Sequence, residues 1–374
     1  MFDYLINTPF KTLTRTMSKG EALRLSSTSP KAMQLVTNGY LIENNIGMDL
    51  LSKFDSRVNL LMVKLAYPRE RAVAEATGMI AACLKRHESL KRVEPPSTEF
   101  LHEVVEFNKT ATGKNPISKE QSDKGVGEWA GYRCNIGTGC SHGCLYCFAE
   151  NFATRFHRVD GSDGWREEVA RDVSTADCKK YSEPIMFPTT HDVTPEYLPA
   201  YRCHLYNILS AGNTVVIVSK PHEESIRAIC TEFSSFRNNM TFRFSIGGLD
   251  NEAMRIWEPG TPALTERLKC LRLAFELGFR TSISAEPMLG NRLDAEQLYY
   301  VVEPFVTEDI WFGKMNNAGR LKKNGDPEIV RRVNELTSTQ SDAEILQLVE
   351  TLNGLPKVAW KDSIKDVIKK YKNN

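Results

Sequence analysis

The spacing of hydrophobic and polar residues changes between the two parts of the chain. Before about Pro96 apolar residues recur at helical spacing, so that Ala72, Ala76 and Ile80 share one face. From Tyr132 onward short apolar runs recur instead, each bounded by turn residues and separated by segments of helical length. We therefore expect a mainly helical N-terminal region followed by alternating strands and helices.

Five of these runs carry a strand pattern. A continuous apolar run such as TVVIVSK is typical of a strand that is buried on both faces, as in a parallel sheet covered by helices. One further strand before the cysteine-rich segment brings the total to about six, fewer than the eight of a complete barrel. The pattern predicts an α/β fold with a partial (β/α)6 barrel. The five runs are EPIMFPTT, TVVIVSK, MTFRFSIGG, RTSISAEPM and EDIWFGKM.

The same patterns divide the chain into four regions. We expect residues 1–107 to form the mainly helical region and residues 108–129, which are polar and rich in Gly, Ser and Lys, to form a linker or an exposed loop. Residues 130–325 would form the partial barrel. Residues 326–374 would form a helical C-terminal extension, because they have helical periodicity and end in lysines, which suit a helix C-terminus.

Composition narrows the class of protein. The 374 residues carry 48 Lys and Arg against 47 Asp and Glu, so a net charge of +1 produces no general attraction to nucleic acid or to a membrane. The start of the chain lacks the apolar core of a signal peptide, and no segment resembles a membrane span. Nine unevenly spaced cysteines do not resemble a secreted disulfide framework. We expect a cytoplasmic protein with reduced or metal-bound thiols and no membrane partner.

The segment CNIGTGCSHGCLYCFAEN contains the strongest functional pattern. Cys140, Cys144 and Cys147 follow the spacing C-x3-C-x2-C directly after the expected first strand. Three thiolates from one short loop suit a 4Fe-4S iron-sulfur cluster whose fourth iron has no protein ligand. Glycines within the loop fit this interpretation, because a loop that wraps a cluster needs unusual backbone angles and close approach.

Other interpretations of the cysteines remain open. A zinc site would need His142 or Cys134 as the fourth ligand, although no second Cys/His pair lies at the usual distance. Cys134 suits a strand in the core, and Cys178 lies in a polar run where we expect it to be exposed. Four more cysteines lie in helix-like segments and are expected to be core thiols: Cys83, Cys203, Cys230 and Cys270.

The cysteine segment resembles the radical S-adenosylmethionine (radical SAM) superfamily, whose signature is C-x3-C-x-aromatic-C, here with Tyr146 as the aromatic residue. The resemblance extends over about residues 132–313, where the chain is similar to the spore photoproduct lyase family, and leaves the N-terminal region unmatched. It implies a radical SAM partial barrel with the cluster loop at the C-terminal rim of the strands. It also implies two cofactors, the 4Fe-4S cluster and S-adenosyl-L-methionine (SAM), which together yield a 5′-deoxyadenosyl radical.

The resemblance carries over to several single residues. Lys220 and Ser245 match positions that contact the methionyl part of SAM, and a lysine and a hydroxyl are suited to a carboxylate. Tyr146, Phe148 and His191 match further positions near the cofactor, Phe148 standing where the family has a second tyrosine. The resemblance thus implies cofactor-binding roles for all five residues.

Three residues are candidates for catalysis. Thr189 stands where the resembled family has a hydrogen-donating cysteine, and a threonine hydroxyl is a poor hydrogen-atom donor, so we do not predict spore photoproduct lyase activity. His191 with Asp192 would form an acid/base pair, although Asp192 suits slightly better the cap of a helix that begins near Thr194. Glu286 would point a carboxylate toward the cofactor. Three residues at the last strand end are weaker substrate candidates: Trp311, Lys314 and Asn316.

These expectations add up to a radical SAM enzyme. By analogy with the resembled family the first expectation for its substrate is nucleic acid, and a peptide or small molecule is the alternative. Such an enzyme needs a one-electron reductant, such as flavodoxin or ferredoxin, as a partner. A non-catalytic iron-sulfur protein that uses the same three cysteines is a further alternative, but it leaves Lys220 and Ser245 without a purpose.

Overall fold

The computed structural model describes residues 48–316, 318–323 and 326–372. The chain divides into two compact units, one ending at Lys91 and the other beginning at Arg92. The division falls before the boundary expected at residue 107, because helix α6 (Thr98–Thr110) packs against α9 (Leu198–Ser210) of the second unit.

The described part of the first unit consists of two helices. Helix α4 spans Met48–Lys64 and helix α5 spans Arg69–Leu90, and the two pack against each other. Ala72, Ala76 and Ile80 lie on one face of α5 and are fully buried, as their spacing predicts. The expectation of helices for residues 1–47 lies outside the described residues.

The second unit is built on an eight-stranded sheet in the order β1-β2-β5-β6-β7-β8-β9-β10. All neighbours are parallel except β1 and β2, which are antiparallel. The expectation of an α/β fold with a mainly parallel sheet is confirmed. The strands are β1 (Ser118–Lys119), β2 (Tyr132–Arg133), β5 (Ile185–Met186), β6 (Val215–Ser219), β7 (Met240–Ser245), β8 (Arg280–Ala285), β9 (Ile310–Phe312) and β10 (Val358–Trp360).

Each of the five apolar runs contains one of the strands β5 to β9, and the sheet's centre is the hydrophobic core. In β6 and β7 almost every residue is buried, which agrees with the continuous apolar runs of strands covered on both faces. Phe242, Phe244, Ile283 and Phe312 have no exposed surface. Strand β6 ends at Ser219, which pairs with Phe244, and strand β7 ends at Ser245, which pairs with Ser284 of β8. Polar residues therefore lie at the carboxyl ends of these strands.

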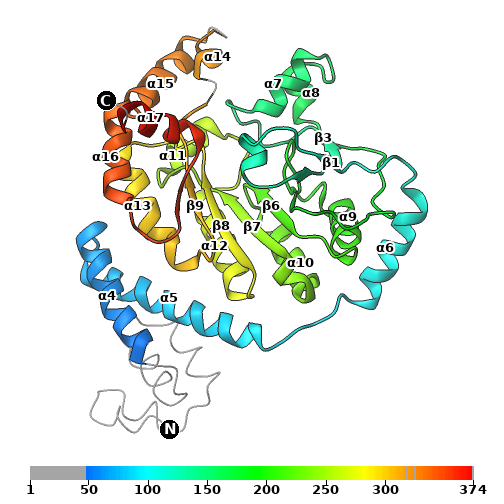
Figure 1. Cartoon of the computed structure of the whole chain (residues 1–374), viewed down its shortest axis with the longest axis horizontal. Helices are drawn as coiled ribbons and strands as arrows, with labels where there is room; N and C mark the ends of the chain where they lie inside the picture. The colour runs from blue at the N-terminus through cyan, green and yellow to red at the C-terminus, as the bar shows by residue number, and fades with distance from the viewer. Residues whose placement is uncertain (1–47, 317, 324–325, 373–374) are drawn as a thin grey trace. The chain divides into compact units, whose positions relative to one another are not determined.

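Helices lie around the strands of the second unit (Figure 1). Helices α10 and α12 pack against each other, and α12 also contacts β7 and β8. The helices after α6 and besides α9 are α7 (Phe148–Arg155), α8 (Gly161–Arg166), α10 (Glu223–Glu232), α11 (Asn251–Trp257), α12 (Leu264–Glu276), α13 (Arg292–Val302), α14 (Ala318–Lys323), α15 (Pro327–Ser338), α16 (Asp342–Leu352) and α17 (Asp362–Lys372). Short 3-10 turns are η2 (Gly125–Glu128), η3 (Ser234–Asn239) and η4 (Glu303–Phe305).

Two short segments depart from the expected pattern. The C-terminal region, expected to be helical, contains β10 between α16 and α17, because the three-residue run Val358–Trp360 pairs with β9. The expected linker, residues 108–129, contains β1 and η2, and β1 pairs with β2. Runs of two or three residues are too short to show a period, so only the pairing partner reveals them. The partial barrel stays a prediction.

A second, two-stranded sheet lies beside the cysteine segment. Strand β3 (Gly137–Thr138) pairs antiparallel with β4 (Val169–Ala170). Helices α7 and α8 lie between these two strands in the sequence and pack against each other.

Among the described residues no helix combines the length and the apolar character that crossing a bilayer requires.

Candidate functional site

The three cysteines lie on the loop between β3 and α7. Its backbone is held from outside: Cys140 N donates to Trp165 O at 2.8 Å and Leu145 N donates to Trp257 O at 3.0 Å. Gly139 has a φ of +94°, and a side chain there would bring its Cβ within 1.9 Å of Glu167 O. Only glycine fits this position without strain.

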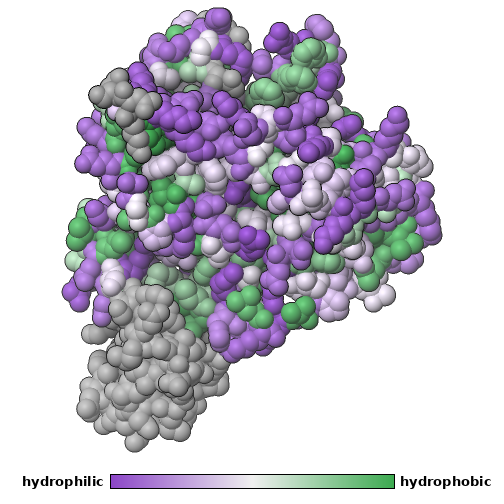
Figure 2. Space-filling view, in the orientation of Figure 1, coloured by the Kyte–Doolittle hydropathy of each residue, from purple (hydrophilic) through white to green (hydrophobic). Residues whose placement is uncertain are grey.

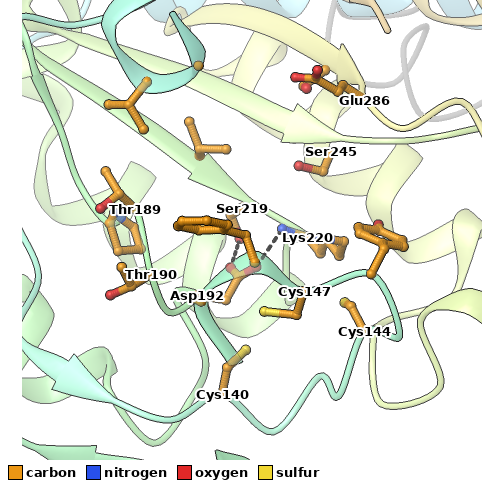
Figure 3. A pocket seen from close by; sticks show the side chains of 18 of the residues that line it. Cys140, Cys144, Cys147, Thr189, Thr190, Asp192, Ser219, Lys220, Ser245 and Glu286 are labelled. Atoms are coloured by element: carbon orange, nitrogen blue, oxygen red, sulfur yellow. Dashed lines mark hydrogen bonds between the residues drawn. The ribbon is translucent and has the colours of Figure 1, made fainter. Parts of the chain in front are cut away.

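All three thiols line one cavity of about 370 Å³ in the second unit. Figure 3 shows the cysteines at one end of this cavity and Glu286 at the other. Cys147 is the N-cap of α7, where its Sγ accepts a hydrogen bond from Glu150 N at 3.3 Å. A helix N-terminus favours a negatively charged sulfur. The three thiols line the same cavity as Ser219 and Ser245, the last residues of β6 and β7.

The donor set fits an iron-sulfur cluster better than zinc. The described residues contain no group of three or more Cys, His, Asp or Glu side chains already arranged to hold a metal ion. The thiols are nevertheless soft donors on one loop, which suits iron-sulfur chemistry. His142, one fourth ligand considered for zinc, has its Nδ1 3.3 Å from Asp192 Oδ2 and its Nε2 2.9 Å from His222 Nε2. Cys134, the other, is buried and does not line the cavity.

Burial favours the protonated thiols in the absence of a metal. It raises the pKa of Cys144 to about 12, although the charge of Lys220 acts against this rise. Burial also raises the pKa of Cys140 and of Cys147. Because the thiolate is the metal ligand, any metal that bound these three cysteines would have to displace their protons.

Asp192 is a buried carboxylate that ties the cysteine loop to strand β6. It accepts hydrogen bonds from Ser219 Oγ and from Lys220 N, the latter at 2.9 Å, and lies against His142. Burial by itself would raise the pKa of Asp192, but His142 and Lys220 together lower it below the usual range. Helix α9 begins only at Leu198. The expectation that Asp192 caps this helix is therefore wrong, because its oxygens are turned to β6 instead.

Lys220 follows β6 and belongs to a charged cluster at the cavity wall. Its Nζ lies 4.0 Å from Glu258 Oε1 and 5.6 Å from the centre of the Tyr146 ring. The Tyr146 hydroxyl donates a hydrogen bond to Glu258 Oε1, and Arg267 Nη1 lies 2.6 Å from Glu258 Oε2. Lys220, Tyr146 and Ser245 all line the cavity, as do Phe148 and His191, so the structure brings all five expected cofactor-binding residues together with the cysteines.

Glu258 was not identified by the sequence analysis, although it is buried and holds two of the expected residues in place. Its segment WEPGTP, between helices α11 and α12, has the composition of a surface turn. The only sequence signal for a functional role of Glu258 was its carboxylate, and a carboxylate within a Gly/Pro turn is usually exposed.

His191 and Thr189 lie at the cavity wall after β5. His191 Nε2 accepts a hydrogen bond from Ile136 N at 3.1 Å, so Nδ1 carries the proton that it donates to Asp192 O at 3.0 Å. Burial lowers the pKa of His191, in keeping with a neutral ring. Both nitrogens are thus engaged with the backbone in this structure, and the catalytic role of His191 stays a prediction.

Thr189 is held by Asn135, a residue that the sequence analysis did not identify. Asn135 Nδ2 donates to Thr189 Oγ1 at 2.7 Å, and Asn135 Oδ1 accepts from Thr189 N at 2.8 Å. Phe148 starts α7 with 66% of its surface exposed, and it lines this cavity at its outer edge. Thr189 and Phe148 therefore both line the cavity, and the roles expected for them stay predictions.

The far end of the cavity is formed by Glu286, Asn316 and Lys361. Asn316 Nδ2 donates to Glu286 Oε1 at 2.9 Å, and Lys361 Nζ lies 3.4 Å from Glu286 Oε2. Lys361 also lies 2.8 Å from Glu128 Oε1 and donates to Gly125 O at 3.2 Å. Burial raises the pKa of Glu286, while the charge of Lys361 acts against the rise.

The remaining candidates do not face the cavity. Lys314 Nζ lies 3.5 Å from Asp342 Oδ1, and the Trp311 ring packs at 5.9 Å from the Trp129 ring, and neither residue lines the cavity.

Cys178, expected to be exposed, is half-buried, which raises its pKa to about 11. The core thiols Cys203, Cys230 and Cys270 are buried, whereas Cys83 is only partly so.

Comparison with known proteins returns distant similarities. No family model matches the chain. Over 217 residues the chain is 24% identical to the uncharacterized protein ORF301 of Acidianus two-tailed virus, covering 53% of this chain and 69% of that protein.

Among solved structures, the chain is similar to spore photoproduct lyase complexed with dinucleoside spore photoproduct, with a TM-score of 0.42, 12% identity, and coverage of 79% of this chain and 95% of that one. A second structure, Streptococcus suis SuiB bound to S-adenosylmethionine, has a TM-score of 0.34 and 11% identity and covers 92% of this chain and 65% of that one. Spore photoproduct lyase and SuiB are both radical SAM enzymes.

Proposed function

We propose that the protein is a cytoplasmic radical SAM enzyme. The observation that carries the proposal is that Cys140, Cys144 and Cys147, from one loop, line the same cavity as Lys220 and Ser245, from the ends of neighbouring strands. Three soft ligands on one side and a cation and a hydroxyl on another are what a cluster and an amino-acid-bearing cofactor need. A simple electron carrier would need only the three thiols.

When bound, the 4Fe-4S cluster and SAM supply a 5′-deoxyadenosyl radical that abstracts hydrogen from the substrate. The chain's own residues hold and shield these groups. Cys140, Cys144 and Cys147 would hold the iron, and Lys220 and Ser245 would orient the carboxylate of SAM.

Two buried carboxylates support this arrangement. Glu258 fixes the Tyr146 hydroxyl, and Asp192 fixes the start of the loop after β6 through Lys220 N. Strands β6 and β7, which end at the cavity, are almost wholly buried and give it a rigid base.

Substrate and electron donor complete the proposal. Nucleic acid is the proposed substrate class, and a peptide or small molecule is the alternative. Glu286 is the residue proposed to contact the substrate, because Glu286 lies at the opposite end of the cavity from the cysteines (Figure 3). A flavodoxin or ferredoxin is the proposed one-electron donor.

The test is reductive SAM cleavage. Protein reconstituted without oxygen with iron and sulfide, then reduced with dithionite, should convert SAM into 5′-deoxyadenosine. Cys144→Ala should remove both the iron and the cleavage, whereas the matched control Cys178→Ala should retain both, because Cys178 does not line the cavity. A protein that binds iron but leaves SAM intact would be the electron carrier, and a colourless protein with bound zinc would end both interpretations.

A further inference from the structure

A second cavity, of about 720 Å³, adjoins the one that contains the cysteines. It lies between α7 and the chain around β2 and β3, and its lining includes Arg133, Phe152 and Arg171. The two cavities share Phe148, Ala149 and Thr190. A molecule that occupies the second cavity can therefore extend a group past Phe148 toward the cysteines.

The lining of this second cavity is basic. It contains three arginines, Arg133, Arg158 and Arg171, and neither aspartate nor glutamate. Arg133 lies 3.5 Å from Glu120, whereas no carboxylate of the described residues lies within ion-pair distance of Arg158 or Arg171. The chain as a whole has a net charge of only +1, so this concentration of positive charge is local. It favours a ligand with several negative charges.

The same cavity exposes aromatic rings. Phe148 and Phe152 of α7 line it, with 66% and 39% of their surfaces exposed; Phe156, which follows at helical spacing just after α7 and is 53% exposed, lies outside the lining. The Phe148 and Phe152 rings are stacked at 6.1 Å, and the Arg158 guanidinium lies 5.0 Å above Phe152. Figure 2 shows hydrophobic side chains among hydrophilic ones over the region of α7 and α8. Large apolar rings left in water beside cations indicate a binding surface.

We propose that this groove, lined by Arg133, Arg158, Arg171, Phe148 and Phe152, binds a single strand of nucleic acid. Arginines take the phosphates and phenylalanine rings take unpaired bases, the combination by which proteins bind single strands without reading sequence. An acidic peptide would use the arginines but not the exposed rings, and a duplex keeps its bases stacked inside. The inference rests on the proposed function in one respect: Phe148, which lines both cavities, directs one nucleotide of the strand into the cavity that contains the cysteines.

The test measures binding of a fluorescein-labelled oligo(dT) and of the matching oligo(U) by anisotropy, with the full chain, across a range of salt concentrations. Arg158→Gln with Arg171→Gln should weaken binding at least tenfold and flatten the plot of log K against log salt by about 0.7 for each phosphate that the protein no longer neutralises. Phe152→Leu keeps an apolar side chain but removes the stacking ring, and should weaken binding about fivefold with the salt slope unchanged.

The matched control is Arg227→Gln, which removes one exposed arginine from α10, outside the groove. It should bind like the unaltered protein. Equal weakening by Arg227→Gln, no binding by the unaltered protein, or equally tight binding of a labelled polyglutamate peptide that is insensitive to Phe152→Leu would each overturn the inference. If the groove variants lose binding while the protein fails to cleave SAM, the groove stands and the proposed function falls.

Discussion

The two ends of the main cavity are built in opposite ways. At one end Cys140, Cys144 and Cys147 come from a single loop, and burial holds their thiols in the protonated form. At the other end Glu286 and Lys361 come from distant parts of the chain and neutralise each other. On the proposed function the first end takes an added metal ion, whereas the second already has its charges paired. The two ends therefore differ in how they are held: the thiols by one loop, and the charged pair by a contact between distant segments.

Lys361 is the centre of the end whose charges are already paired. Its ammonium is engaged by Glu128, Glu286 and Gly125 O, and its side chain is 3% exposed. Glu128 belongs to η2 and Lys361 follows β10, so these contacts join the chain near β1 and β2 to the opposite edge of the sheet. Lys361 also lies 4.0 Å above the Trp129 ring. This side-chain contact takes the place of backbone pairing between the two edges.

The largest expected effect comes from breaking that contact. Lys361→Met removes a buried cation, which leaves Glu286 without an ion-pair partner and Glu128 with only the more exposed Lys365, and should lower the free energy of unfolding by about 3–5 kcal/mol, as measured by urea denaturation. The matched control is Lys365→Met: Lys365 lies 3.3 Å from the same Glu128 but is 42% exposed, so its replacement should cost less than about 1 kcal/mol. Equal effects of the two variants would show that burial of Lys361 contributes nothing.

The next effect concerns the end that needs an ion. Asp192→Ala leaves Ser219 Oγ and Lys220 N without their acceptor and frees His142 within the cysteine loop, so iron affinity should fall about 10- to 100-fold. Iron retained against a chelator, after anaerobic reconstitution, is the measurement. Asp192→Asn, which keeps the shape of the side chain, should lose less. Unchanged iron retention in both variants would remove Asp192 from the support of the loop.

The smallest effect separates the two ends. Glu286→Gln keeps the hydrogen bond with Asn316 but loses the attraction to Lys361, which Glu128 still neutralises. We expect the free energy of unfolding to fall by about 1 kcal/mol and iron retention to equal that of the unaltered protein. Loss of iron in Glu286→Gln would mean that the two ends are not independent.

Much of the site could be predicted because its residues are adjacent in the sequence or end apolar runs. The cysteine spacing identified the loop, and the ends of TVVIVSK and MTFRFSIGG identified Lys220 and Ser245. Asn135, Glu258 and Lys361 were missed. Each is a polar residue whose partner lies far along the chain, such as Asn135 with Thr189, and a single polar residue carries no periodic signal.

The role of a side chain was harder to predict than its location. Asp192 and His191 were both expected near the cavity, and both lie there. The sequence could not show that His191 uses both ring nitrogens on the backbone, nor that Asp192 turns to β6 instead of capping α9. A side chain's hydrogen-bond partners depend on which strands are neighbours, and strand order is not encoded locally.

Local sequence was sufficient to specify the strand runs, the helices and the three-thiol loop, because each depends on residues within a few positions of one another. The folded arrangement was needed to show which loops meet at the cavity, that Lys361 joins the two edges of the sheet, and that three arginines from separate segments face exposed phenylalanines. These features depend on parallel strands bringing distant residues side by side, and contacts of that kind leave no repeating pattern along the chain.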